Sequence, residues 1–552
     1  MITANILNLF DQTIYYGTLT VANGRIAEIH RLGPERAGEP YILPGFVDAH
    51  VHIESSLLTP PQFARLAVVH GTVATVSDPH EIGNVLGVDG VHYMIREAQR
   101  VPFKFMFGAP SCVPATPFET AGATIGVRDV RNLLMLKEIG YLAEMMNFPG
   151  VLHQDPDVMA KIALAQAFNK PVDGHAPGLT GDEAQRYIDA GISTDHECFT
   201  YEEGLDKARR GMHILIREGS AARNFDALIP LLAEFPAQIM FCSDDKHPDT
   251  LMVGHINQLV VRALAAGHSV WQVLRAACLN PVLHYRLPVG LLREGDPADY
   301  IMVDNLQTFQ IRQTVINGEV VAESGHSTIP DLRSEHVNQF TCSPKKPHDF
   351  SVTFAAEGEM YQERSIRVIE ALDGQLITNE LHLEPKLDGK QIVPDVERDI
   401  LKLVVVNRYQ DAPPAVAFIE NFGLKHGALA SSVGHDSHNI TAVGCDDDSL
   451  CRAINLVIES KGGLAAVSGF GEAHLLPLPV AGLMTDADGY EVAAQYAAFD
   501  RFAKQELGST LAAPFMTLSF MALLVIPTLK LSDKGLFDGK RFAFVALQTE
   551  NL

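Results

Sequence analysis

The sequence predicts an α/β protein built on a (β/α)8 barrel, with a composite small β domain and a C-terminal α/β domain added to it. Three observations support this prediction. Short apolar or β-branched runs alternate with helix-like stretches over residues 44–290. Two β-rich segments flank that block, and a second α/β-like stretch follows it.

The two flanking segments each have the pattern of a β-hairpin. Asn23-Gly24 lies inside TLTVANGRIAEI, and Asn317-Gly318 lies inside DPADYIMVDNLQTFQIRQTVINGEVV. An Asn-Gly pair supplies the positive φ angles that a tight two-residue turn needs. Because the segments stand on either side of one block, we predict that residues 1–43 and 291–340 form a single small β domain, of β-sandwich type, into which the block is inserted.

Within residues 44–290, strand-like runs end in polar residues. PGFVDAHVH opens the block, and the later runs are GTVATVSD, FKFMFGAPS, YLAEMMN, PVDGHAP, GISTDHE and AQIMFCSDD. Strands separated by helical segments predict parallel βα units. The carboxyl ends of barrel strands carry the chemistry in this architecture, so these polar residues are the candidate site.

The stretch TCSPKKPHD after the second flank predicts a linker. Residues 345–552 are then expected to form the C-terminal α/β domain, with strand-like LVVVNRY and GGLAAVSG. Neither a Walker loop nor a G-x-G-x-x-G motif follows a strand, so the chain lacks the common nucleotide-phosphate motifs.

The net charge and the cysteine content limit the classes of partner that the protein can bind. A net charge of -24, from 67 acidic and 43 basic residues, disfavours nucleic acid and membrane partners and favours a small-molecule substrate. Seven scattered cysteines without a Cys-x-x-Cys pair argue against a disulfide framework and a thiolate zinc site. With no signal-like start in MITANILNLFDQ, a cytoplasmic location is expected.

The most apolar late segment is MTLSFMALLVIP, which is shorter than the span of about 20 residues that a bilayer requires. It would suit a buried core or a contact between subunits. A homo-oligomer is the expected assembly.

Metal-ligand side chains recur at the predicted strand ends. In PGFVDAHVHIESS, residues 48, 50 and 52 alternate and therefore share one face of a strand. A solvated strand face would explain this pair of histidines alone, and Asp48 could cap a turn. The later strand ends add further ligands, and the full set favours a two-metal centre, because imidazoles and carboxylates suit zinc, iron or manganese. The proposed ligands are His50, His52, Glu144, His175, His196 and Asp244.

These motifs resemble those of the amidohydrolase superfamily and, within it, the adenine deaminase family. The resemblance rests on PGFVDAHVHIESS, SDPHEIGNV, EMMNFPGV, DGHAPGL, STDHECF, MFCSDDKHPD, GDPADYIMVD, KHGALASSVGHDSHNI and VAGLMTD, which cover nearly the whole chain. It marks residues 44–290 as an amidohydrolase barrel and 345–552 as an adenine-deaminase-type domain. Members with a carbamylated lysine are similar in layout, but the matching position here is Glu144.

The resemblance implies hydrolytic deamination of adenine to hypoxanthine and ammonia by a metal-bound hydroxide, as part of purine salvage. The cofactor would be two divalent metal ions, manganese or iron, with zinc as a further option. A metal lowers the pKa of water to roughly 7, which supplies a nucleophile at neutral pH.

The resemblance also implies roles for individual residues. One cation would be held by His50, His52 and Asp244, the other by His175 and His196, with Glu144 as the bridge. Asp244 would also accept the proton of the attacking water and pass it to the departing ammonia. Asp245 competes for this role, but it falls on the opposite side if the strand continues.

A purine also needs a proton at ring nitrogen N1, because addition at C6 builds negative charge there. The candidates are His80 and Glu81 in SDPHEIGN, and Glu54 beyond the first strand. A first-turn carboxylate would equally explain Glu54, and a loop turn would explain the other two. The C-terminal GHDSHN, residues His435, Asp436 and His438, predicts either local hydrogen bonds or a site packed over a barrel mouth, its own or a neighbour's.

Other activities compete with this interpretation. The same metals could act on a related aminopurine or on an amide, as in amino-sugar deacetylation or cyclic-amide opening. A cytidine-deaminase-like zinc site is excluded, since it needs Cys-x-x-Cys. A non-catalytic barrel subunit is a remote alternative, because all six proposed ligands are present.

Overall fold

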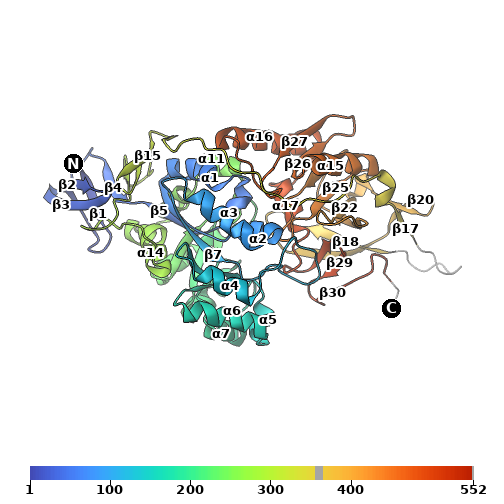
Figure 1. The fold of residues 1–552 in the computed structure, drawn as a ribbon, viewed down its shortest axis with the longest axis horizontal. Coiled ribbons are helices and arrows are strands. Elements are labelled where there is room, and N and C mark those ends of the chain that lie inside the picture. The colour runs from blue at the N-terminus through green and yellow to red at the C-terminus, as the bar shows by residue number, and fades with distance from the viewer. Residues whose placement is uncertain (355–364, 550–552) are drawn as a thin grey trace.

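The computed structural model describes residues 1–354 and 365–549. The N-terminal strands lie at one end of the elongated molecule, the barrel lies in the middle, and the C-terminal sheets lie at the other end (Figure 1). The side chains that form the candidate site come from the middle and the C-terminal parts.

The two flanks meet in one eight-stranded sheet, in the order β16-β15-β14-β13-β4-β1-β2-β3. Strand β4 pairs with β13 and so joins the flanks. Both Asn-Gly turns have the predicted positive φ angles, 52° and 73° at residues 23 and 24, and 48° and 79° at residues 317 and 318. The strands are β1 (Ile2–Asn8), β2 (Thr13–Ala22), β3 (Arg25–Pro34), β4 (Tyr41–Pro44), β13 (Tyr300–Val303), β14 (Ile311–Ile316), β15 (Glu319–Glu323) and β16 (His326–Ser327).

Eight parallel strands form the barrel and confirm the predicted fold class. Parallel pairing runs from β5 to β9 and from β10 to β12. Parallel bridges between Val172 and Ile192, and between Val51 and Asp244, close the ring. The strands are β5 (Phe46–Val51), β6 (Thr72–Ser77), β7 (Lys104–Ala109), β8 (Ile139–Met145), β9 (Val172–Gly174), β10 (Thr194–Asp195), β11 (His213–Arg217) and β12 (Ile239–Cys242).

Helices follow the barrel strands, as βα units require. Local signals fix where they begin: the Asp155 side chain accepts from the backbone N–H groups of Asp157 and Val158 and so caps α6. The helices are α1 (Pro60–Ala67), α2 (His80–Leu86), α3 (Val88–Ala98), α4 (Val127–Leu134), α5 (Phe148–Leu152), α6 (Pro156–Ala167), α7 (Gly181–Asp189), α8 (Tyr201–Arg209), α9 (Phe225–Leu228), α10 (Leu231–Glu234), α11 (Pro248–Val253), α12 (Ile256–Ala265), α13 (Val270–Leu274) and α14 (Asn280–Tyr285). Short 3-10 turns occur at Ile53–Ser56 and Val68–His70, and a π-helical turn, Arg275–Leu279, joins α13 to α14.

The C-terminal part contains an eight-stranded sheet in the order β19-β18-β23-β22-β25-β24-β26-β27. The predicted strand-like runs LVVVNRY and GGLAAVSG contribute to β22 and β26. The strands are β18 (Ile366–Ala371), β19 (Thr378–Leu383), β22 (Leu401–Val406), β23 (Ala415–Glu420), β24 (Ala428–Ser431), β25 (Ile440–Gly444), β26 (Gly463–Val467) and β27 (Ala473–Pro477). Smaller sheets use β17 (Val352–Thr353), β20 (Lys386–Asp388), β21 (Gln391–Val393), β28 (Leu529–Ser532), β29 (Gly535–Asp538) and β30 (Ala543–Phe544).

Among the described residues of this part, the α-helices are α15 (Asp447–Glu459), α16 (Gly489–Arg501) and α17 (Pro514–Phe520). The apolar segment predicted as a core or subunit contact begins within α17, and most of its side chains are buried. In residues 1–354 and 365–549, no helix combines the length and apolar character needed to cross a membrane.

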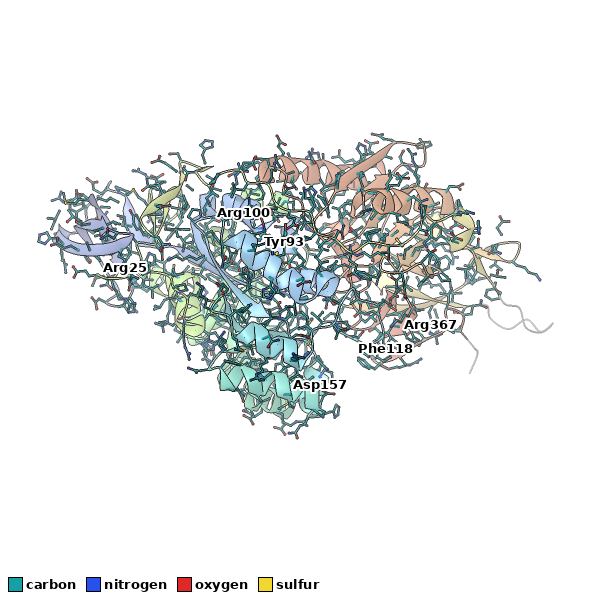
Figure 2. All side chains as sticks on the ribbon, in the orientation of Figure 1. Arg25, Tyr93, Arg100, Phe118, Asp157 and Arg367 are labelled. Atoms are coloured by element: carbon teal, nitrogen blue, oxygen red, sulfur yellow. The ribbon has the colours of Figure 1, made fainter. Side chains whose placement is uncertain are left out.

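The C-terminal part packs directly on the barrel. Phe118, in the loop after β7, lies beside the C-terminal strands (Figure 2). Its ring centroid is 4.8 Å from that of Phe537 and 5.2 Å from that of Phe542. This contact places a C-terminal surface over the loops that follow the barrel strands.

Asp48 links the first and last strands of the barrel. Its carboxylate accepts hydrogen bonds from the Ser243 backbone N–H at 2.9 Å, from the Ser243 hydroxyl, and from the His255 ring at 2.7 Å. The residue is fully buried. Asp48 therefore connects β5 to the segment after β12 and to the start of α12, and its side chain is occupied by these partners.

We predict that Asp48→Ala lowers the free energy of unfolding by about 3–5 kcal/mol, because it leaves buried polar partners unsatisfied. Urea unfolding followed by circular dichroism measures this change. The exposed Asp388→Ala is the matched control and should change stability by less than about 0.5 kcal/mol. Equal stability of the two variants would contradict the proposed role of Asp48 in barrel closure.

Candidate metal centre at the barrel mouth

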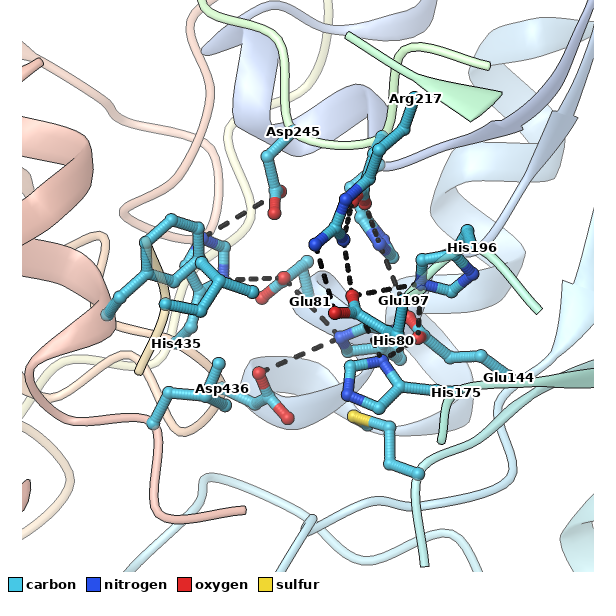
Figure 3. A pocket seen from close by; sticks show the side chains of 16 residues that line it. His80, Glu81, Glu144, His175, His196, Glu197, Arg217, Asp245, His435 and Asp436 are labelled. Atoms are coloured by element: carbon cyan, nitrogen blue, oxygen red, sulfur yellow. Dashed lines mark hydrogen bonds and ion pairs between the residues drawn. The ribbon is translucent and has the colours of Figure 1, made fainter. Parts of the chain in front are cut away.

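Five of the six predicted ligands line one cavity at the carboxyl end of the barrel (Figure 3). The sixth, His50, is outside the lining, with its Nε2 3.9 Å from Glu144 Oε1. The barrel contributes His52, His80, Glu81, Glu144, Met146, His175, His196, Glu197, Arg217, Asp244 and Asp245. The C-terminal part contributes Leu376, His435, Asp436, Phe520 and Leu523.

Glu144 lies between two sets of imidazoles. Its Oε1 is 3.3 Å from Nε2 of His52 and 3.9 Å from Nε2 of His50. Its Oε2 is 2.7 Å from Nδ1 of His175 and 3.2 Å from Nε2 of His196. A carboxylate that presents one oxygen to each set has the geometry to bridge two cations.

Asp244 lies on the side of the first set. Its Oδ1 is 3.3 Å from Nε2 of His52 and 3.7 Å from Nε2 of His50. Its Oδ2 accepts a hydrogen bond of 2.5 Å from Nη1 of Arg217. The Asp244 backbone N–H donates to the carbonyl of His50 at 2.9 Å. Because this backbone bond joins the segment after β12 to β5, the relative positions of these ligands are fixed by the barrel itself.

The donor set fits divalent cations. Both ring nitrogens of His50 are buried without a hydrogen-bond partner among the residues described, and so is Nε2 of His175. Buried polar atoms without partners are rare and call for an explanation. Candidate ligand atoms of His50, His196 and Asp244 lie within 4.8 Å of one another, as do those of Glu144, His175 and His196. Imidazole and carboxylate ligands at this spacing suit zinc, iron or manganese.

The carboxylates are held in the ionised form that ligands require. Burial acts against it, but hydrogen bonds from His175, His196 and His52 hold the pKa of Glu144 well below its usual range. Burial is likewise outweighed at Asp244, where the Arg217 guanidinium and His52 hold the pKa well below the ordinary value. Burial, followed by the neighbouring His196, lowers the pKa of His50, so its ring is neutral and can coordinate a cation.

Two charged residues of the cavity lining, Glu197 and Arg217, were not predicted from the sequence. Arg217 donates from Nη2 to Glu197 Oε2 at 2.9 Å and from Nη1 to Glu197 Oε1 and to Asp244. Glu197 Oε1 lies 3.4 Å from Nε2 of His196. Arg217 is the final residue of β11, whose sequence HILIR is not among the predicted strand-like runs. Glu197 directly follows the predicted ligand His196, and this position is the signal in the sequence that could identify it.

The structure also corrects the expectation for Asp245. Both Asp244 and Asp245 line the cavity, so Asp245 does not point to the opposite side. The reason is that β12 ends at Cys242, and Asp244 has a φ of 54°, which breaks the alternation of a strand. Asp245 accepts a hydrogen bond from the Ser55 hydroxyl.

The proposed proton donors occupy different positions. His80 Nδ1 lies 3.1 Å from Asp78 Oδ2 and 3.5 Å from Glu144 Oε1, so this ring faces the metal-ligand set. Glu81 also lines the cavity. Glu54 is absent from the lining, and its Oε1 accepts from the backbone N–H of Ile82 at 3.2 Å. Glu54 therefore lies behind the cavity wall, where burial raises its pKa to about 7.

The cluster in GHDSHN lies over the mouth of its own barrel. His435 Nδ1 is 2.7 Å from Glu81 Oε1, and His438 Nε2 pairs with Glu81 Oε2. Asp436 Oδ1 is 3.9 Å from Nε2 of His80. These contacts join the C-terminal part to the cavity, so the cluster does more than form local hydrogen bonds. The His435 ring also stacks on Phe520, with centroids 4.9 Å apart.

Comparison with known proteins gives consistent matches. The amidohydrolase family model matches residues 41–321, and the adenine deaminase C-terminal domain model matches residues 375–543. An adenine deaminase of Sulfurovum sp. (strain NBC37-1) is 54% identical over 542 residues, which is 98% of each chain. Adenine deaminases of Salinibacter ruber and Methanosarcina mazei are 53% and 50% identical, and cover 99% and 98% of this chain and 98% of their own lengths.

Glu119 connects the loop after β7 to the C-terminal cluster. It is buried, and it accepts hydrogen bonds from the Ser437 hydroxyl and, at 3.2 Å, from the Thr116 hydroxyl. Burial, with the nearby Asp436 carboxylate, raises the pKa of Glu119 to about 8. The folded chain therefore binds this proton more tightly than the unfolded chain, and stability falls as pH rises toward 8.

We predict that Glu119→Gln raises the melting temperature relative to the unmodified protein, by an amount that grows from about pH 5 to about pH 8. Glutamine keeps an acceptor for Ser437 but cannot ionise, so the cost of burying a charge disappears. Calorimetry across this pH range measures the difference, with the exposed Glu28→Gln as control. A difference that stays constant with pH would contradict the raised pKa.

Proposed function

Since the chain belongs to the adenine deaminase family of the amidohydrolases, we propose that it hydrolyses adenine to hypoxanthine and ammonia at the barrel mouth, a reaction of purine salvage. The observation that carries the proposal is the buried Glu144, whose two oxygens face separate sets of imidazoles. The three relatives described above are each named adenine deaminase and match almost the full length of this chain. Their names support adenine over an amide substrate, and an enzyme over a non-catalytic subunit.

The cofactor in this proposal is a pair of divalent cations, manganese or iron. The amidohydrolase family implies a divalent metal centre, and the choice of metal rests on the ligand types. When bound, the cations would ionise a water molecule at neutral pH and stabilise negative charge on the substrate. One cation would be held by His50, His52 and Asp244, the other by His175 and His196, with Glu144 between them.

Asp244 is proposed to move the protons of the reaction. Arg217 binds its Oδ2, which leaves Oδ1 toward the histidines and the cavity. An ionised carboxylate in this position can accept a proton from the attacking water and donate it to the departing amine. Arg217 acts through Asp244, because it fixes the orientation of this carboxylate and balances its charge.

The cavity suits an uncharged aromatic base. Leu376, Phe520 and Leu523 form an apolar side, which can pack against the face of a purine. Arg217 is the only arginine or lysine in the described lining, and two carboxylates already pair with it. A phosphate group would find no free positive side chain here, so the geometry favours a base over a nucleotide.

Glu81 is the proposed proton donor to N1. Its Oε1 lies 2.7 Å from Nδ1 of His435. Burial is outweighed at Glu81, where His435 and His438 hold its pKa well below the usual range, and despite burial the Glu81 carboxylate helps to raise the pKa of His435 to about 9. The proton that Glu81 would pass to N1 is therefore held by His435 beside the cavity. The His80 ring lies between the two carboxylates, with Nδ1 3.5 Å from Glu144 Oε1 and Nε2 3.4 Å from Glu81 Oε1, which suits a supporting position between the metal ligands and Glu81. Glu54 would act only through the backbone of Ile82, and we propose that it positions the start of α2.

The proposal extends to organisation and location. We propose that residues 1–43 with 291–340, residues 44–290 and residues 345–552 are the three domains. All seven cysteines are free, which agrees with a reducing, cytoplasmic compartment. A homo-oligomeric assembly is part of the same proposal.

The proposed reaction predicts that purified protein loaded with manganese converts adenine to hypoxanthine and releases one ammonia per adenine. Ultraviolet absorbance and an ammonia assay follow the reaction, and elemental analysis should find two metals per chain. Glu144→Gln should lose metal and activity together, because a neutral amide cannot bridge two cations. Turnover of amino sugars or cyclic amides without turnover of adenine would contradict the substrate. Retention of two metals by Glu144→Gln would contradict the bridge.

A second prediction separates the proposed proton donor from its neighbour. Glu81→Gln should lower kcat by about 10²–10⁴-fold with both metals retained, because N1 then lacks its acid. Glu54→Gln, the matched control behind the cavity wall, should lose much less activity and should mainly lower the melting temperature. Equal losses of kcat in the two variants would contradict the assignment of Glu81.

A further inference from the structure

A second cavity opens at the amino end of the barrel, away from the metal centre. Strand β11 begins there with His213 and ends in the metal centre with Arg217, so the two cavities lie at opposite ends of one strand. The space is open to solvent, and the cavity volume is about 410 Å³. Its lining residues are His213, Ala237, Arg275, Asn280, Leu283, His284 and Arg286.

The arginines of this cavity are not neutralised. The guanidinium of Arg275 forms no hydrogen bond or ion pair with any residue in 1–354 or 365–549. Arg286 donates to the backbone carbonyl of Asn169 at 3.0 Å and to its side-chain oxygen at 3.4 Å, and both acceptors are uncharged. No aspartate or glutamate is among the described lining residues. This is a local excess of positive charge in a chain whose net charge is -24.

The other polar lining residues are two histidines and Asn280, whose side chain donates to the carbonyls of Pro236 and Ile239. The rings of His213 and His284 lie 4.4 Å apart, and Nδ1 of His213 is buried without a hydrogen-bond partner among the described atoms. Burial, followed by the neighbouring His213 and Arg286, lowers the pKa of His284 to about 3. Burial also lowers the pKa of His213. No carboxylate raises the pKa of either histidine, and no aspartate or glutamate is among the described lining residues.

We propose that this cavity binds a phosphate-type anion, either inorganic phosphate or the phosphate group of a small ester. A guanidinium matches the oxygens of phosphate in geometry and charge, and a tetrahedral anion has enough oxygens to engage Arg275 and Arg286 together. The unpartnered nitrogen of His213 offers a further polar contact. The inference stands apart from the deamination reaction, since it uses no residue of the metal centre.

The chain contains its own reporter for the test. Trp271 is the only tryptophan, and it lies in α13 about one helical turn before Arg275. Inorganic phosphate is titrated into the full-length, metal-loaded protein at constant ionic strength, with chloride as the compensating anion. A saturable change in Trp271 fluorescence is expected. Parallel titrations with glycerol phosphate and adenosine monophosphate distinguish free phosphate from phosphate esters.

Matched variants decide the location. Arg275→Gln should weaken phosphate binding by about tenfold or more, because it removes one charge-assisted contact. Arg128→Gln removes an exposed arginine of α4 and should leave binding unchanged. Unchanged adenine turnover and melting temperature would show that Arg275→Gln folds normally, and turnover also reports on the separate deamination proposal.

Three results would overturn the proposal. The first is the absence of saturable phosphate binding. The second is equal phosphate binding by Arg275→Gln and the unmodified protein, which is the result expected if phosphate occupies only the metal centre. The third is a change of oligomeric state in Arg275→Gln, seen by light scattering, without a change in phosphate binding. That result would make the cavity a contact between subunits.

Discussion

Charge balance inside the barrel mouth is the constraint on which the rest of the structure depends. Glu144, Glu197 and Asp244 are buried together, and the Arg217 guanidinium contacts two of them. Burying carboxylates without partners is costly, so this arrangement needs further positive charge. Despite burial, the neighbouring carboxylates raise the pKa of His52 and His196, which favours positive charge on these rings. Divalent cations would supply the positive charge when the same nitrogens act as ligands. The fold and the chemistry therefore depend on the same group of side chains.

The barrel and the C-terminal part make different contributions to this site. Strand pairing fixes the ligand atoms, because β5 and the segment after β12 are joined both by backbone hydrogen bonds and by Asp48. The C-terminal part adds Phe520 and His435 above the cavity, and His435 contacts Glu81 of the barrel. A chain without the C-terminal part would retain the ligands and lose the cover.

Local patterns in the sequence predicted the elements whose signals are local. Alternating polar residues identified β5, and the Asn-Gly pairs identified turns at residues 23 and 317. The run HILIR is short and has a histidine and an arginine at its ends, so its pattern does not predict a strand and gives no signal for Arg217. The side on which Asp245 lies depends on where β12 ends, and apolar runs do not define that end to a single residue.

The position of the C-terminal cluster depends on long-range packing. Nothing within GHDSHN indicates that Glu81 is its partner, because the two segments meet only when one part of the chain docks on the other. The same reasoning applies to Glu54, whose distance from the cavity follows from the short turn after β5 and the start of α2. The sequence identifies these residues as possible proton donors or ligands, but it does not give the distances between them.

The apolar cover formed by Leu376, Phe520 and Leu523 belongs to a different stretch of the chain from the metal ligands. Selection can therefore reshape the part that faces the heterocycle while the hydrolytic machinery below stays intact. A new substrate preference could arise through a few changes in side-chain volume at these positions. The same separation offers protein engineers a place to alter selectivity at little risk to metal loading.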